Sequence, residues 1–150
     1  MGVWQEWRRG DRGFGTVDVS AIVIQRNVFM DARYFEDWKV GDRIETLGRT
    51  VGDAEISQFV ALGGFFEELF MNSEYVAQQS LYPKRFAPGA LIFSFTEGLI
   101  IMSGCIHGVG LALVSVDEMT FKRPLFAGDT MKVLVEVSTL VRLAVATGAS

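Results

Sequence analysis

The chain has 150 residues, of which 49% are hydrophobic and 12% aromatic, and its formal net charge at pH 7 is −4. This length fits one domain with a substantial core, and the mild negative charge excludes the broad basic surface of a nucleic-acid-binding protein. The chain contains one cysteine, Cys105, and one histidine, His107, so it forms no internal disulfide and no His/Cys zinc site. We expect a cytoplasmic protein, because residues 1–13 contain no apolar export signal or lipidation signal. We also expect no metal and no cofactor.

The first half of the chain predicts a strand, a turn and a helix. Residues 15–26 alternate, with Val17, Val19 and Val23 on one face and polar residues on the other, which indicates a half-buried strand. Gly41 and Asp42 predict a turn into a short strand. Asp53 then opens an amphipathic helix, which Gly63 and Gly64 end.

Residues 65–85 lack a clean period, so we predict a loop with a short helix at 73–79. Pro88 and Gly89 begin a long apolar helix, since proline is tolerated in a first helical turn. The stretch 89–116 is long enough to span a membrane and carries only Glu97 and His107 as ionisable groups. Glu97 would cost about 2.5 kcal/mol or more near the centre of a bilayer, and glycines from residue 104 onward interrupt the run. We therefore expect a buried helix of a protein outside the membrane.

After Gly110, residues 111–126 and 130–141 predict two strands separated by a turn at Gly128 and Asp129. A buried helix flanked by long strands favours an α+β fold, with an antiparallel sheet wrapped around the helix.

Four stretches, "TVGDAEISQFVALGG", "EYV", "RFAPGALIFSFTEGL" and "MTFKRPLFAGDTMKVLVEV", carry a family resemblance over roughly residues 32–141. Together and in this order they resemble the MaoC-like dehydratase family of hotdog-fold proteins. The resemblance implies a single hotdog domain over residues 1–150 and a homodimer, or a higher homo-oligomer of dimers, with sites at the subunit boundary. It also implies that the substrates are acyl thioesters of coenzyme A or acyl carrier protein.

Family members that hydrate enoyl-CoA use an Asp and a His in a motif that reads Gly-Asp-x-Asn-Pro-(aliphatic)-His. Aligned on Gly64, this sequence has Phe65 at the aspartate and Phe70 at the histidine. Water addition needs one group that activates water and another that delivers a proton, and a phenyl ring can do neither. The usual dyad mechanism is therefore missing from this sequence.

The N-terminal stretch "DRGFGTVDVSAIVIQRN", residues 11–27, resembles the last strand of the family, which the C-terminal end of this sequence lacks. We therefore predict a circular permutation, with residues 16–24 paired along residues 131–139. The alternative is an unrelated added edge strand.

Gly89, together with Pro88, is the strongest candidate for substrate binding, because a glycine in the first helical turn lets a thioester carbonyl approach a backbone N–H. Close packing of helix on sheet explains the glycine equally well. Glu67 and Glu68 are candidates for a replacement acid/base if an apolar wall encloses them, and solvated loop carboxylates otherwise.

Three further groups have open roles. Glu97 is either a satisfied polar group of the core or a site residue. Phe65, Phe66 and Phe70 are core aromatics or walls for an acyl chain. Four basic residues are solvated or bind the phosphates of coenzyme A, and these are Lys84, Arg85, Lys122 and Arg123. His107 and Cys105 lack the context of catalytic groups.

The sequence thus leaves open whether the protein is an enzyme. One hypothesis is a hydro-lyase of the enoyl-CoA hydratase/dehydratase class that works through Glu67 or Glu68. A second is a noncatalytic thioester-binding subunit, and a third is a homodimer whose pocket is filled by phenylalanines. The acyl chain, the carrier and the direction of the reaction are not specified by the residues.

Overall fold

The computed structural model describes residues 2–7, 15–18, 22–24 and 32–142 of the chain. One antiparallel sheet has the strand order β4-β8-β1-β2-β7, and β5 also pairs with β8. Its strands are β1 (Gly2–Trp7), β2 (Gly15–Asp18), β4 (Arg43–Glu45), β5 (Arg49–Thr50), β7 (Glu118–Met119) and β8 (Thr130–Glu136). Two further strands, β3 (Ile22–Ile24) and β6 (Gly110–Leu113), pair with each other. The 3-10 helix η1 (Phe35–Asp37) precedes β4.

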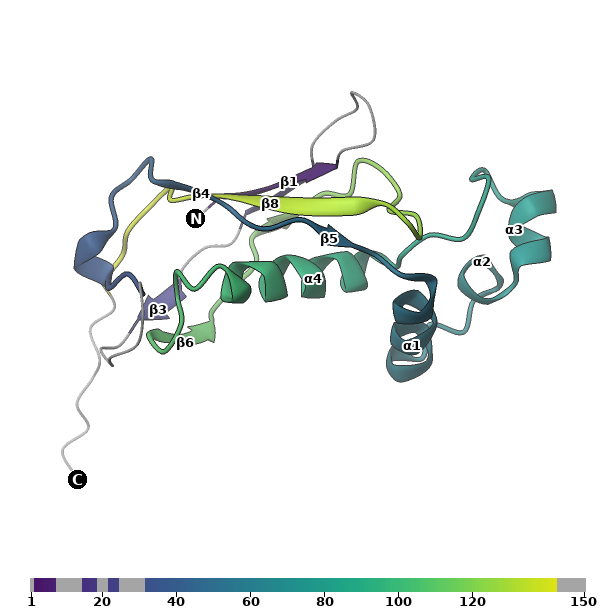
Figure 1. Cartoon of the computed structure of the whole chain (residues 1–150), viewed down its shortest axis with the longest axis horizontal. Helices are drawn as coiled ribbons and strands as arrows, with labels where there is room; N and C mark the ends of the chain where they lie inside the picture. The colour runs from purple at the N-terminus through teal and green to yellow at the C-terminus, as the bar shows by residue number, and fades with distance from the viewer. Residues whose placement is uncertain (1, 8–14, 19–21, 25–31, 143–150) are drawn as a thin grey trace.

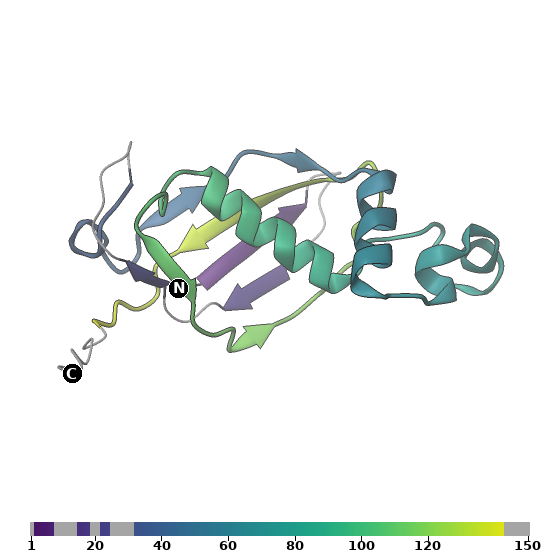
Figure 2. The same cartoon turned by 90° about the horizontal axis from the view of Figure 1, so that it is seen from below.

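Helix α4 (Gly89–Met102) lies across one face of this sheet, as Figures 1 and 2 show. The arrangement is the expected α+β fold, with an antiparallel sheet against a central helix. Three shorter helices lie beyond one end of the sheet, and these are α1 (Asp53–Gly63), α2 (Glu68–Met71) and α3 (Ser73–Gln79). Among the described residues, no helix has both the length and the apolar character needed to cross a membrane.

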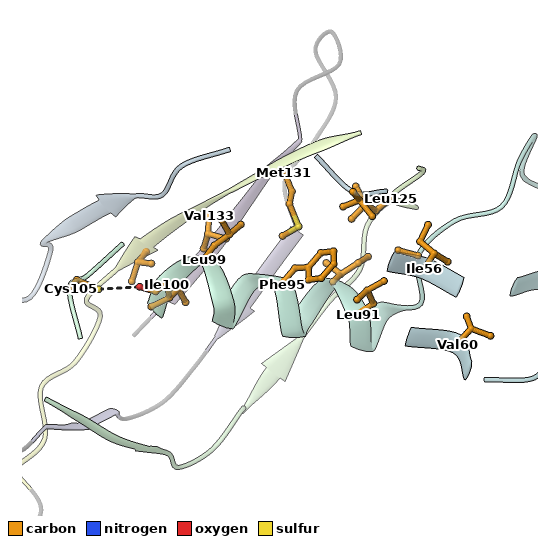
Figure 3. Packing of buried hydrophobic residues seen from close by; sticks show 14 of the residues in the cluster. Ile56, Val60, Leu91, Phe95, Leu99, Ile100, Cys105, Leu125, Met131 and Val133 are labelled. Carbon is orange, nitrogen blue, oxygen red and sulfur yellow. Dashed lines mark hydrogen bonds between the residues drawn. The ribbon is translucent and has the colours of Figure 1, made fainter. Parts of the chain in front are cut away.

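The core forms where α4 meets β8 (Figure 3). The burial of β8 alternates strictly, and Met131, Val133 and Val135 point to the helix side. From α4 the buried side chains include Leu91, Phe95 and Leu99, and Ile56 of α1 extends the cluster beyond the helix. Burying a side chain of this kind stabilises the fold by roughly 1.5–3 kcal/mol, so this seam is the main source of stability.

The predicted buried helix is confirmed on one face only. Ala90, Ser94, Glu97 and Ile101 are exposed, and their spacing places them on one stripe of the helix. The helix therefore buries one face against the sheet and turns the other to the surface.

The predicted helix boundaries are largely confirmed. The helix that begins at Asp53 ends where Gly64 adopts a φ of 70°, a left-handed conformation that glycine reaches without steric cost. The short helix at 73–79 is confirmed as α3, with Asn72 Oδ1 accepting hydrogen bonds from the backbone N–H groups of Glu74 and Tyr75. The one-turn helix α2 and the strand β1 are not predicted from the sequence.

The predicted pairing of residues 16–24 with residues 131–139 is wrong. The place beside β8 belongs to β1, with Gly2 opposite Glu136 and Trp7 opposite Met131. β2 pairs instead with β1 and β7, and β3 pairs with β6. β2 is thus an inner strand of the sheet and not an edge strand.

We propose that a hairpin of two strands, rather than a single strand, is permuted in this chain. β1 and β2 lie between β8 and β7, although they come first in the sequence. Because Gly2 lies opposite Glu136, β1 begins beside the end of β8, where a chain leaving β8 could turn directly into it. This juxtaposition supports a rearrangement that keeps the sheet and changes only the chain order.

An arginine connects three elements at the start of α1. Arg49 of β5 forms an ion pair with Glu55, with 2.6 Å between Nη2 and Oε1, and its guanidinium lies 3.7 Å from the centre of the Phe95 ring of α4. Glu55 Oε2 also accepts a hydrogen bond from the Gly52 N–H at 2.7 Å, which caps the helix. The Gly52 hydrogen bond and the Arg49 side chain both lower the pKa of Glu55.

Replacing Glu55 with Gln should lower the free energy of unfolding at neutral pH by about 1 kcal/mol, a value that allows for partial exposure of the ion pair. A carboxyl whose pKa is lowered by folding stabilises the protein above its unfolded pKa, and this contribution is lost as the pH falls through the folded pKa. The difference in stability between wild type and E55Q should therefore shrink as the pH falls below about 4. Chemical denaturation of both proteins between neutral and acidic pH measures it, and a constant difference would contradict the assigned cap.

A rearranged variant tests the permuted hairpin. Residues 32–142, followed by a short Gly/Ser linker and then residues 2–24, should unfold cooperatively at a temperature close to that of the parent chain, because every strand keeps its neighbours. A control consisting of residues 32–142 alone loses two inner strands and should not show the transition. Circular dichroism during heating measures the unfolding transition of each protein. A rearranged variant that lacks the transition, like this control, would contradict the proposal.

Candidate functional site

The segment that contains Phe65 and Phe70 turns back against the end of α1. The Phe65 N–H donates to the Val60 carbonyl at 3.0 Å, and the Glu67 N–H donates to the Phe65 carbonyl at 2.8 Å. A Cβ on Gly63 would lie 2.5 Å from the Phe65 ring, so glycine is needed there for the ring to fold onto the helix end. The two glycines thus both end α1 and place Phe65.

Phe65 and Phe70 come together in one aromatic cluster. Their ring centres are 6.4 Å apart with planes at 83°, an edge-to-face contact. Phe59 extends the cluster on the Phe65 side at 5.5 Å, and Phe86 on the Phe70 side at 5.6 Å. The cluster continues from Phe86 to Tyr82 and Phe126. Phe65 and Phe70 are therefore neighbours in space, and their occupation of the dyad positions stays a prediction from the sequence motif.

Glu67 and Glu68 are exposed, and within the described part of the chain neither carboxylate has a hydrogen-bond or ion-pair partner. Phe66, one of the residues expected to enclose them, is itself 68% exposed. In this chain by itself the two carboxylates are therefore hydrated. Their role in acid/base chemistry stays a prediction.

The start of α4 is fixed by its backbone. The Ala87 N–H donates to the Leu125 carbonyl at 2.7 Å, and the carbonyl of the buried Pro88 accepts from Leu91 and Ile92. A Cβ on Gly89 would lie 2.7 Å from Cε2 of Phe121, whose side chain is 43% exposed. Close packing of an aromatic ring therefore accounts for the glycine.

Glu97 lies on the exposed stripe of α4 and not in the core. It therefore needs no buried partner, which removes the reason for expecting one. Glu97 lies more than two turns along the helix from Gly89 and belongs neither to the helix start nor to the aromatic cluster.

The four basic residues have different environments. Arg85 is held by intramolecular contacts, among them an ion pair with Asp53 at 2.6 Å. Lys84 Nζ lies 5.1 Å from the centre of the Phe126 ring and donates to the Ala127 carbonyl. Lys122 and Arg123 are exposed. Of the four, Arg85 has its guanidinium committed to the protein itself, a role that the sequence alone does not indicate.

The single cysteine and the single histidine follow α4. Cys105 is buried, and desolvation raises the pKa of its thiol; Sγ lies 3.8 Å from the Ile100 carbonyl oxygen, to which it donates (Figure 3). His107 is exposed in the turn that leads to β6. Among the described residues, no three His, Cys, Asp or Glu side chains gather in a group that could hold a metal ion.

Known proteins resemble the chain in sequence and in structure, although no family model matches it. Protein MaoC of Klebsiella aerogenes is 28% identical over 131 residues, which make up 87% of this chain and 35% of that protein. This chain thus spans about a third of the length of that relative. A monoamine oxidase regulatory protein from Archaeoglobus fulgidus is 30% identical, with 70% of each chain covered and a TM-score of 0.62.

The chain belongs to the MaoC-like hotdog family. Two further solved structures agree. A MaoC-like dehydratase from Rhodospirillum rubrum is 26% identical over 69% of this chain and 68% of that one, with a TM-score of 0.52. An (R)-hydratase from A. caviae involved in PHA biosynthesis is 26% identical over 69% of this chain and 75% of that one, with a TM-score of 0.55. The hotdog fold and the MaoC-like family expected from the sequence are thereby confirmed.

Proposed function

We propose that this MaoC-like chain binds acyl thioesters of coenzyme A or acyl carrier protein, and that it does not hydrate them through an Asp/His dyad. The observation that carries the proposal is the edge-to-face contact of Phe65 and Phe70, at the two positions that align with the dyad. Neither ring can activate water or deliver a proton. Their partly exposed faces, with those of Phe86 and Phe126, are apolar surface suited to an aliphatic chain.

In this proposal, the thioester carbonyl binds at the start of α4. Pro88 lacks an N–H, so Gly89 supplies the first backbone donor of the helix, at its positive end. A carbonyl that approaches Gly89 on the side of its missing Cβ would require the Phe121 ring to move aside, because an added Cβ would lie 2.7 Å from that ring. A side chain that is 43% exposed has room for such a rotation.

A second candidate function is hydration through Glu67 or Glu68. It is favoured by the position of both carboxylates inside the same turn as Phe65 and Phe70. Because both are exposed in the single chain, a partner surface would have to enclose one of them before it could act as a general acid or base near neutral pH.

We further propose that the partner is a second hotdog chain, either another copy of this protein or a subunit with an intact dyad. All four residues of β6 are exposed, including Leu111 at 54%. Within the described part of the chain, β6 pairs on one side only, with β3. An apolar strand with a free edge favours pairing with another chain, and the exposed stripe of α4 ends nearby in sequence, at Ile101 and Met102.

The wild-type protein should bind a long-chain enoyl-CoA more tightly than crotonyl-CoA, because the aromatic cluster offers more contact to the longer chain. It should bind without consuming the enoyl thioester. Isothermal titration measures the affinity, and loss of the enoyl-thioester absorbance measures turnover. Turnover that disappears in E67Q or E68Q would establish the second candidate instead, and absence of binding would contradict both.

A pair of matched variants locates the acyl chain. Phe70→Ala removes a ring of the cluster and should weaken binding of the long-chain ligand roughly tenfold, while Phe66→Ala removes a ring that has no aromatic contact among the described residues. Equal losses in the two variants would contradict binding along the cluster.

Leu111→Asp should convert the wild-type dimer into a monomer, because it places a charge on the proposed interface. Leu47→Asp is the control, since Leu47 is also exposed but lies between β4 and β5, away from β6. Sedimentation velocity of the three proteins at micromolar concentration measures the change. A dimer that survives in L111D would contradict the proposed edge, and a monomeric wild type would contradict pairing with another copy of this chain.

A further inference from the structure

Arg85 is held at the centre of a set of contacts that begins at α1. Its side chain is 17% exposed, and Nη2 lies 2.6 Å from Asp53 Oδ1. The same nitrogen donates to the Asp53 carbonyl at 3.1 Å and to Ser57 Oγ at 2.8 Å. The guanidinium is therefore fixed against the first turn of α1.

The other terminal nitrogen reaches the segment of the candidate site. Arg85 Nη1 donates to the Phe70 carbonyl at 3.2 Å. This carbonyl lies in α2, a helix of a single turn, whose last carbonyls have no following turn to supply amide donors. The Phe70 N–H donates to the Glu67 carbonyl at 2.8 Å, and the charged Arg85 donor, which forms stronger hydrogen bonds than a neutral group, holds the Phe70 carbonyl.

The residues that follow Arg85 contact both the aromatic cluster and the start of α4. The Phe86 ring packs edge-to-face on Phe70, and the backbone of Phe86 forms a bridge with Phe126. The Ala87 N–H donates a hydrogen bond to the Leu125 carbonyl, and α4 begins two residues later at Gly89. Five consecutive residues, 85–89, thus join the Phe65–Phe70 segment to the first turn of α4.

We propose that Arg85 is a positioning residue that sets where the Phe65–Phe70 segment lies relative to the start of α4. For its effect on ligand binding, this inference rests on the proposed thioester function. The planar guanidinium donates in two directions at once, toward α1 and toward Phe70, which a lysine ammonium on a flexible stem cannot reproduce at the same distances. Since both terminal nitrogens already have acceptors within the protein, this role takes the place of the alternative that Arg85 binds the phosphates of coenzyme A.

Native-state hydrogen exchange tests the positioning directly and needs no ligand. Arg85→Met should speed exchange of the amides of residues 65–72 about tenfold or more, because the contact that closes this segment is lost. Arg85→Lys should fall between wild type and R85M. The matched control is Arg49→Met, which also removes an arginine–carboxylate pair from the first turn of α1 but has no contact with the segment in question.

R49M should leave exchange of residues 65–72 within about twofold of wild type, as expected for local opening of a separate unit. Unchanged exchange in R85M, or an equal increase in R49M, would overturn the proposal. The affinity for a long-chain enoyl-CoA should fall in R85M, recover in part in R85K and stay unchanged in R49M. An unaltered affinity in R85M, with binding in wild type, would remove Arg85 from the site.

The two proposals fail separately in this design. If the wild-type protein binds no thioester, the proposed function is contradicted, whereas the exchange contrast between R85M and R49M still decides whether Arg85 positions the segment. If the wild type binds and the exchange contrast is missing, the function stands and the role of Arg85 is refuted.

Discussion

The apolar seam between α4 and β8 is the interaction on which the rest of the structure depends. One face of α4, with Leu91, Phe95 and Leu99, meets the alternate residues of β8 that point toward it. Because side chains alternate along a strand, this contact fixes the register of β8 and hence of the strands that pair with it, β1, β4 and β5. It also fixes the position of Gly89, at the end of the helix nearest α1.

The arm formed by α1, α2 and α3 is connected to this core by buried apolar side chains of α1, among them Ile56 and Val60, and by two arginines. Arg49 lies over Phe95 and pairs with Glu55, while Arg85 pairs with Asp53 and reaches Phe70. Both arginines therefore meet the first turn of α1, where acidic side chains are also favoured by the helix dipole. Of the two, only Arg85 reaches the Phe65–Phe70 segment, whereas Arg49 connects the start of α1 to α4.

Local signals in the sequence predict the parts of the fold that local chemistry decides. The glycines at 63 and 64 end α1, Asn72 caps α3, and the alternation from Met131 onward gives β8. The partner of β8 is not encoded locally, since Gly2 and Glu136 are far apart in the chain, and the predicted pairing was wrong for this reason. The exposed stripe of α4 is marked in the sequence by a single charge, Glu97, because Ala90, Ser94 and Ile101 carry none. The contacts of Arg85 are not predicted from the sequence, because they join residues 53, 57 and 70, which only the folded chain brings together.

Within the proposed function, the apolar surroundings of positions 65 and 70 favour two phenyl rings over a single polar group. A carboxylate at position 65 would lie between the rings of Phe59 and Phe70, where an ionised group without a partner is costly. An imidazole at position 70 would likewise face Phe65 and Phe86, with no carboxylate among the described residues of the cluster to orient it. Either polar group alone would therefore be unpaired in an apolar environment. Two phenyl rings instead stabilise each other through edge-to-face packing. The left-handed conformation of Gly64 and the contact of Arg85 with the Phe70 carbonyl involve only the backbone of this segment, so the same backbone can hold an acid/base pair or an apolar wall. This independence is why the chain can belong to a family of hydratases and dehydratases and still serve, as we propose, to hold the thioester.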